Sequence, residues 1–260
     1  MLPKALILHA TGTNRDHDAA DAFREAGAQP EIIHLNQLRS GQRRFSDYQM
    51  LVLPGGFSYA DALGAGKLLA LDLKEFFATE IREFIAAGKP VIGICNGFQA
   101  LVKSGILPDP QETGALSAAT LAFNARGHFE CRWVTLKPQS RLCLWTRGLA
   151  RLVYCPVAHG EGNFIPRDAE VASSLRLKDQ IALVYSRPNG EPAGGRYPEN
   201  PNGSTLDVAG ICNPRGNVLG LMPHPENHVS PNQHPRWTRG DAAGSGLPLL
   251  INGVRYAKEM

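Results

Sequence analysis

The stretch that decides the fold is PVIGICNGFQALVK, residues 90–103. Pro90 to Ile94 is a continuous apolar run, which is typical of a central strand covered by helices on both faces. Residues 98–103 have a helical apolar pattern. Between the two, Cys95 has a glycine two residues away on each side. A buried strand, a sharp turn that glycines permit and a helix are the context of a nucleophile elbow, which would project the sulfur from the top of the sheet.

Toward the N-terminus, strand-like runs alternate with helical patterns. The strand-like runs are Lys4–His9, Glu31–Leu35 and Met50–Leu53. One helical pattern passes through Ala19, Phe23 and Ala26 and ends at Gly27. A second helix is expected to start with Asp72 as its cap and with Leu71 and Phe76 as a hydrophobic staple, and to end at Gly88. This order predicts an α/β fold with an open, mostly parallel sheet flanked by helices. In such sheets active sites form outside the carboxyl ends of the strands. Cys95 and the pair Gly55–Gly56 both lie at such ends.

The C-terminal half is β-rich. Its strand-like runs, separated by Gly, Pro and Asn turns, are Phe129–Leu136, Leu152–Val157, Ile181–Tyr185, Val208–Cys212 and Val218–Met222. Residues 249–258 are expected to form a terminal helix. We expect residues 1–260 to make a single domain, in which 227–246 is an irregular loop or extension.

Composition excludes several classes of protein. The chain is 43% hydrophobic and 20% charged, its formal charge is only +3, and its longest run of Arg or Lys is the pair Arg43–Arg44, so no nucleic-acid partner is indicated. No apolar stretch approaches the ~20 residues that span a membrane, and the start reads as a strand, so we expect a cytoplasmic protein. The five cysteines include no C-x-x-C pair. We expect most of them to be buried and only Cys95 to combine exposure with thiolate character, because it lies at a helix N-terminus.

A base and a carboxylate follow another strand. Pro223-His224-Pro225-Glu226 comes directly after the apolar run that ends at Met222. In extended backbone, positions two apart face the same side, so Glu226 can accept a hydrogen bond from one nitrogen of His224. The other nitrogen can then take the proton of Cys95, as in a catalytic triad. A zinc site built from His224, His228 and His234 is the alternative, but Pro225 disfavours one unbroken helical turn between the first two, and we expect no metal.

Two glycine-rich turns complete the candidate site. The N–H of Gly56, after the third strand, and the N–H of Asn96, next after the nucleophile, can both stabilise an oxyanion. His159-Gly160-Glu161-Gly162 can grip the backbone of an amino acid. Each of the two turns, taken alone, fits an ordinary loop equally well.

Together these residues resemble the class I, or triad, glutamine amidotransferases, whose fold is flavodoxin-like. Three phrases resemble the glutaminases of the phosphoribosylformylglycinamidine synthase family: Gly55-Gly56-Phe57-Ser58-Tyr59, Cys95-Asn96-Gly97-Phe98-Gln99 and Pro201-Asn202-Gly203-Ser204. The resemblance implies a triad of Cys95, His224 and Glu226, and oxyanion donors at Gly56 and Asn96. It also implies glutamine contacts at Gln99, His159, Gly160 and Phe57.

The resemblance has further implications for partners. It implies a synthetase subunit, which binds ATP, magnesium and formylglycinamide ribonucleotide, and a small bridging subunit. This chain has no phosphate-cradling P-loop, so we expect no cofactor in it. Because the chain begins directly with its first strand, we expect a separate subunit. It would hydrolyse glutamine and deliver ammonia for de novo purine biosynthesis.

Two departures from the family pattern and two alternatives remain. One departure lies in the loop after the third strand, where Ala60-Asp61 stands in place of the family's Gly-Asp and residues 63–66 lack an expected Arg; the other is the segment 227–246, which is longer than the usual ending. One alternative is the glutaminase of another amidotransferase, against which Asn96 and Phe98 argue. The other is a protein of the same fold with an elbow cysteine that is not an amidotransferase, which Pro-His-Pro-Glu disfavours.

Overall fold

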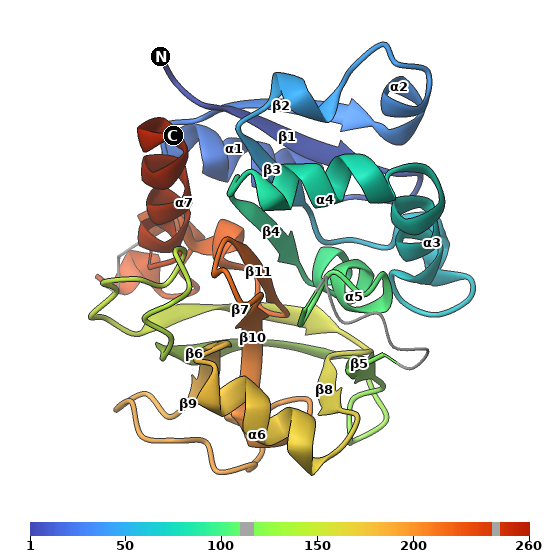
Figure 1. Cartoon of the computed structure of the whole chain (residues 1–260). Helices are drawn as coiled ribbons and strands as arrows, with labels where there is room; N and C mark the ends of the chain where they lie inside the picture. Colours follow the sequence, from blue (N-terminus) through green and yellow to red (C-terminus); the bar gives the residue numbers. More distant parts are fainter. Residues whose placement is uncertain (110–116, 241–244) are drawn as a thin grey trace.

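The computed structural model describes residues 1–109, 117–240 and 245–260. Both halves of the chain contribute strands to one nine-stranded mixed sheet (Figure 1). The strand order is β2-β1-β3-β4-β11-β10-β9-β6-β7. The strands are β1 (Lys4–His9), β2 (Gln29–His34), β3 (Met50–Leu53), β4 (Val91–Ile94), β6 (Glu130–Pro138), β7 (Val153–His159), β9 (Ile181–Ser186), β10 (Val208–Cys212) and β11 (Val218–Leu221). β5 (Ala119–Ala122) and β8 (Asn163–Pro166) form a separate antiparallel pair.

The predicted α/β fold with a β-rich C-terminal half is confirmed, and the sheet is more mixed than expected. It is parallel from β2 to β11 and antiparallel from β11 to β7. The strands of the C-terminal half therefore extend the first sheet. As a result, β11 lies directly beside β4 although more than a hundred residues separate them.

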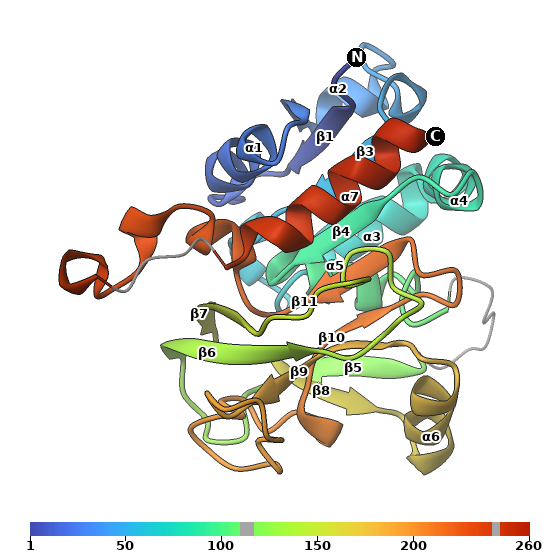
Figure 2. The same cartoon turned by 90° about the vertical axis from the view of Figure 1, so that its left-hand side faces the viewer.

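Helices cover both faces of the parallel strands, with α1 and α4 on opposite sides (Figure 2). The helices are α1 (Asp16–Glu25), α2 (Leu35–Arg39), α3 (Lys67–Phe76), α4 (Ala78–Ala86), α5 (Asn96–Lys103), α6 (Ala169–Leu177) and α7 (Leu247–Glu259). The terminal helix is confirmed, and α7 packs beside α1. No helix in the described parts of the chain is both long and apolar enough to cross a membrane.

The single helix expected from Asp72 to Gly88 is wrong. Two helices, α3 and α4, meet at Phe77, whose backbone leaves the helical region at φ −132°. Asp72 lies inside α3, which starts after Gly66, and it accepts a hydrogen bond from the hydroxyl of Tyr59. The side chains that were expected to staple a helix start, Leu71 and Phe76, are instead exposed.

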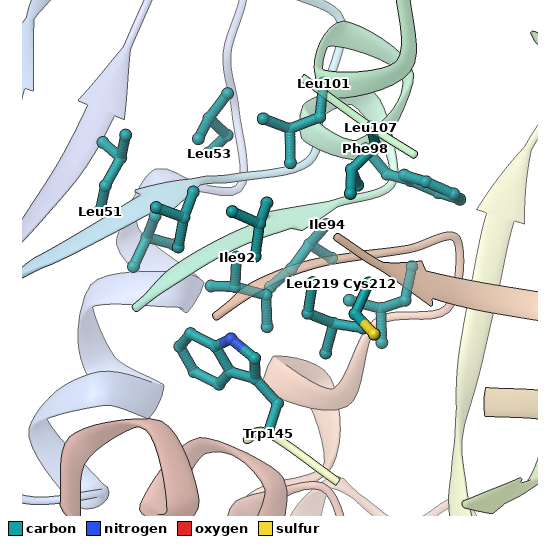
Figure 3. Packing of buried hydrophobic residues seen from close by; sticks show 14 of the residues in the cluster. Leu51, Leu53, Ile92, Ile94, Phe98, Leu101, Leu107, Trp145, Cys212 and Leu219 are labelled. Atoms are coloured by element: carbon teal, nitrogen blue, oxygen red, sulfur yellow. The ribbon is translucent and has the colours of Figure 1, made fainter. Parts of the chain in front are cut away.

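The hydrophobic core extends from β1 to α7, and Figure 3 shows a part of it in which apolar side chains of β3, β4, β11 and α5 meet. Every residue of β4 is buried, as its continuous apolar run predicts. Phe98 of α5 packs against Gly220 of β11, where an added β-carbon would lie 2.0 Å from the phenyl ring. The elbow helix is therefore held against the strand that leads into the His224 segment.

Candidate active site

The nucleophile elbow forms where β4 passes into α5, as predicted. Cys95 adopts φ 52° and ψ −106°, a strained conformation for a residue with a side chain. An added β-carbon on Gly97 would lie 2.0 Å from the carbonyl oxygen of Leu53, and one on Gly93 would lie 2.8 Å from the backbone of Gly97. These glycines therefore have a second role besides permitting the turn, because the strands and the helix approach too closely for side chains at these positions.

His224 and Glu226 form the predicted pair beyond β11. The Nδ1 atom of His224 lies 2.6 Å from Oε1 of Glu226, and the two side chains are 3% and 1% exposed as residues. Burial lowers the pKa of His224, but the charges of Glu226 and Cys95 raise it by more, to about 10. The prediction of extended backbone from His224 to Glu226 is wrong. Pro225–His228 is a short 3-10 helix, and this turn still brings the carboxylate of Glu226 to the imidazole of His224.

Cys95 lies within the same enclosure. An added β-carbon on Gly55 would lie 2.7 Å from Cε1 of His224 and 3.4 Å from Cβ of Cys95, so both side chains border this glycine. The sulfur faces the carbonyl oxygen of Ala158 at 3.7 Å. The expectation that Cys95 is the exposed cysteine is wrong, since it is 5% exposed and Cys131 is the exposed one.

The two predicted oxyanion donors lie on neighbouring segments. The N–H of Asn96 is in the first turn of α5, where a helix leaves its amides unpaired, and the N–H of Gly56 donates to no oxygen of the described residues. The amide oxygen of the Asn96 side chain accepts from both N–H and Oγ of Ser58, at 3.2 and 2.6 Å. This link holds the loop after β3 against the elbow. The oxyanion role of both amides stays a prediction.

Three of the four predicted glutamine contacts are placed as follows, and their roles also stay predictions. Gln99 donates to the carbonyl of Glu161 at 2.6 Å and accepts from Asn96 at 3.1 Å, so its amide connects the elbow to the turn after β7. Gly160 lies in that turn, where its carbonyl accepts from the N–H of Asn124. Phe57 is exposed beside the loop that follows β1.

The fourth, His159, is buried at the end of β7. Its Nδ1 atom lies 3.1 Å from Oδ1 of Asn124, and its Nε2 atom has no partner among the described residues. Burial and then the charge of His224 lower the pKa of His159 to about 3. The imidazole therefore stays neutral at physiological pH.

The sequence did not predict two features beside the triad, Arg15 and the path of the segment after Glu226. Arg15, at the start of α1, is close enough to feel the charges of Glu226 and Cys95, although its hydrogen bond to Asp18 does most to raise its pKa. The irregular segment after Glu226 doubles back onto β7, because the hydroxyl of Ser245 accepts from the N–H of Tyr154 and donates to its carbonyl. The signal for Arg15 was its place in the loop after the first strand, at the same sheet edge as Cys95.

The irregular segment has short helices of its own. Within 227–246 the structure has 3-10 turns at Pro231–Gln233 and Trp237–Arg239, and residues 241–244 of the prediction lie outside the described residues. His228 and His234 pack with Trp133 and Tyr154 in one ring cluster. No group of three or more His, Cys, Asp or Glu side chains in the described ranges is placed to hold a metal ion.

Comparisons with known proteins agree with this geometry. A family profile described as a CobB/CobQ-like glutamine amidotransferase domain matches residues 2–257. A protein of Treponema denticola named phosphoribosylformylglycinamidine synthase subunit PurQ is 57% identical over 98% of this chain and 99% of its own length. A protein of the same name from Dehalococcoides mccartyi is 42% identical over 99% of this chain and 98% of its own length.

Solved structures agree as well. A chain of a structure described as PurLQS from Thermotoga maritima superposes with a TM-score of 0.74 and 29% identity, over 98% of this chain and 99% of that one. The chain belongs to the glutamine amidotransferase family, as its motifs predicted. Within that family, the resemblance to the glutaminases of phosphoribosylformylglycinamidine synthase is confirmed by the names of these relatives.

Proposed function

We propose that this chain is the glutaminase subunit of phosphoribosylformylglycinamidine synthase, which releases ammonia from glutamine for a synthetase subunit in purine biosynthesis. The observation that carries the proposal is the meeting of Cys95, at a strained elbow, with the buried pair His224–Glu226. Relatives with the name of this subunit, 57% and 42% identical over nearly the whole chain, support it.

The chemistry follows from the residues. The sulfur of Cys95 attacks the carboxamide carbon of glutamine, while His224 takes the thiol proton and returns it to the nitrogen as the carbon–nitrogen bond breaks. Glu226 keeps the imidazole oriented and stabilises its charged form. The amides of Gly56 and Asn96 receive the oxyanion. Water then cleaves the thioester, with His224 as base, and glutamate leaves.

The partners belong to the proposal too. The solved relative comes from a structure described as PurLQS, which supports assembly with a synthetase and a small bridging subunit. ATP and magnesium would be held by the synthetase. A glutaminase for another synthetase would use the same triad, but the names of the relatives favour the purine pathway. Assignment to the cytoplasm stays a prediction.

A variant of the nucleophile tests the proposal. Cys95→Ala, assembled with its synthetase, is expected to lose glutamine-dependent product formation and to keep synthesis from added ammonium salt, because Cys95 acts only in releasing ammonia. Both rates are measured as product formed per complex, with the wild-type complex as control. Loss of the ammonia-driven reaction in a complex that still assembles would show that Cys95 does something other than supply nitrogen.

A further inference from the structure

His159 is a buried titratable side chain, next to the carbonyl that faces Cys95, that the triad chemistry does not use. It is 3% exposed, and its Nε2 atom is among the few buried polar atoms with no hydrogen-bond partner in the described ranges. Buried polar atoms in native proteins nearly always have a partner, so an unpaired one calls for a ligand or another explanation.

The neighbours of His159 decide which nitrogen carries its proton. The side-chain nitrogen of Asn124 donates to the carbonyl oxygens of His128 and His159, at 3.0 and 2.8 Å, and its oxygen accepts from the N–H of Gly162 at 3.0 Å. These bonds fix the orientation of the amide, with its oxygen toward Nδ1 of His159. Nδ1 therefore carries the hydrogen, and in the neutral ring Nε2 has a free lone pair.

The lone pair lies on the side of the ring away from Asn124, and the triad borders this part of β7. Side chains of β7 alternate, so that Cys155, Val157 and His159 are all buried on one face. The charge of Glu226 reaches Cys155, and the charge of His224 reaches His159. The carbonyl of Ala158, one residue before, faces the sulfur of Cys95.

We propose that Nε2 of His159 accepts a hydrogen bond from the carboxamide –NH2 group of glutamine, and then from the departing ammonia; this rests on the proposed glutaminase function. A lone pair requires a donor, and glutamine has two, the carboxamide nitrogen and the α-ammonium. The carboxamide nitrogen must come to His224 to receive its proton, and β7 contacts both triad members: the carbonyl of Pro156 accepts from the N–H of His224, and the carbonyl of Ala158 faces the sulfur of Cys95. Since His159 follows Ala158 directly, we assign the leaving nitrogen as its donor.

The proton balance of the step is simple. The sulfur–carbon bond forms, the carbon–nitrogen bond breaks, and the proton that completes ammonia comes from His224. His159 neither gains nor loses a proton. Because its imidazole is a weak base that stays neutral, it can hold ammonia by one N–H without converting it to ammonium. The ammonia leaves in the form that can act as a nucleophile elsewhere.

Two substrates that differ only in the leaving group test this assignment. L-glutamine has N–H bonds on its leaving group, and L-glutamate γ-methyl ester has none, while their α-amino and α-carboxylate groups are the same. His159→Asn keeps a donor near Nδ1 and removes the acceptor at Nε2. We expect it to lower kcat/KM for glutamine by about 10- to 100-fold, the usual effect of one lost hydrogen bond to a buried group, and to change kcat/KM for the ester less than about 3-fold.

A second variant and a folding control complete the experiment. His159→Gln places an acceptor oxygen near the position of Nε2 and is expected to recover part of the glutamine rate. Stoichiometric alkylation of Cys95 by a glutamine-like chloroketone shows that each variant retains the site. Equal losses with the two substrates, or no loss with glutamine, would overturn the assignment. A wild-type complex with the synthetase that hydrolyses neither substrate would instead overturn the proposed function.

Discussion

Gly97, Phe98 and Gly220 show how single residues set the elbow. The absence of a side chain on Gly97 lets α5 approach Leu53 of the neighbouring strand, and the absence of one on Gly220 makes room for the ring of Phe98. A helix that lies this close to β3 and β11 holds the amide of Asn96 next to the sulfur. Two residues of the Cys-Asn-Gly-Phe motif, Gly97 and Phe98, are therefore required by packing. Gly220, from a distant part of the chain, provides the space that Phe98 fills.

The two members of the pair beyond β11 are expected to differ in effect. His224→Ala removes the group that moves the proton. Glu226→Gln keeps a group near Nδ1 of His224 but removes the negative charge that raises the pKa of the imidazole in the wild type. We expect His224→Ala to lower kcat for glutamine on the order of 10²-fold more than Glu226→Gln does, as base and orienting acid differ in other triads. Steady-state glutamate release by both variants checks this, and equal rates for His224→Ala and the wild type would refute the triad.

At the scale of an element, the loop after β3 carries one of the two departures from the family pattern. Tyr59 and Ala60 both adopt left-handed backbone conformations, with φ of 55° and 53°. Glycine, which the family resemblance predicts at the second position, adopts this conformation without a β-carbon penalty. Ala60 thus strains the loop that Ser58 attaches to Asn96.

Relief of this strain is a measurable effect. Ala60→Gly is expected to raise the free energy of unfolding by roughly 0.5–1 kcal/mol, because removing the left-handed penalty outweighs the extra freedom of the unfolded chain. Ala62→Gly is the matched control, since Ala62 is also exposed but has φ −55°. It should lower the free energy of unfolding by roughly 0.5–1 kcal/mol. Urea denaturation measures both, and a destabilised Ala60→Gly protein would contradict the strain.

At the scale of the whole molecule, one sheet assembles the site from four distant segments. β4 supplies Cys95, β3 leads to Gly56, β11 leads to His224, and the antiparallel strand β7, at the far edge of the sheet in hydrogen-bonding order, ends at His159. The carbonyl of Pro156 in β7 accepts from the N–H of His224 at 2.8 Å, so the edge strand closes over the parallel part. This closure buries the triad and the neutral histidine together.

The burial of His159 lowers the folding stability of the protein at low pH. The pKa of His159 is about 3 in the folded state and ordinarily about 6.5, so between these values the unfolded chain binds a proton that the folded chain does not. Folding stability therefore falls as pH falls through this window, by up to about 1.4 kcal/mol per pH unit from this group.

The acid dependence is checked by comparing the wild type with His159→Gln. The free energy of unfolding of the variant is expected to fall less steeply between pH 6.5 and 4.5, because glutamine does not titrate. Denaturation at several pH values measures the two slopes, and a constant offset between the proteins reflects lost contacts only. Parallel slopes over the whole interval would contradict a neutral His159.

The sequence by itself determined the α/β class, the strand before Cys95, the elbow and the pairing of His224 with Glu226. These depend on local causes: apolar periodicity, glycines at a turn, and two residues separated by a proline. Local pattern did not separate α3 from α4, which meet at Phe77 and pack against different segments: α3 against α5, and α4 against the 3-10 turn Phe45–Asp47.

Tertiary structure alone decided which distant segments meet. Local periodicity does not indicate which strands become neighbours, so the pairing of β11 with β4 and the burial of Cys95 under Ala158 were not predictable. The tautomer of His159 was out of reach for the same reason. It depends on Asn124, 35 residues away, whose orientation only the folded loop determines.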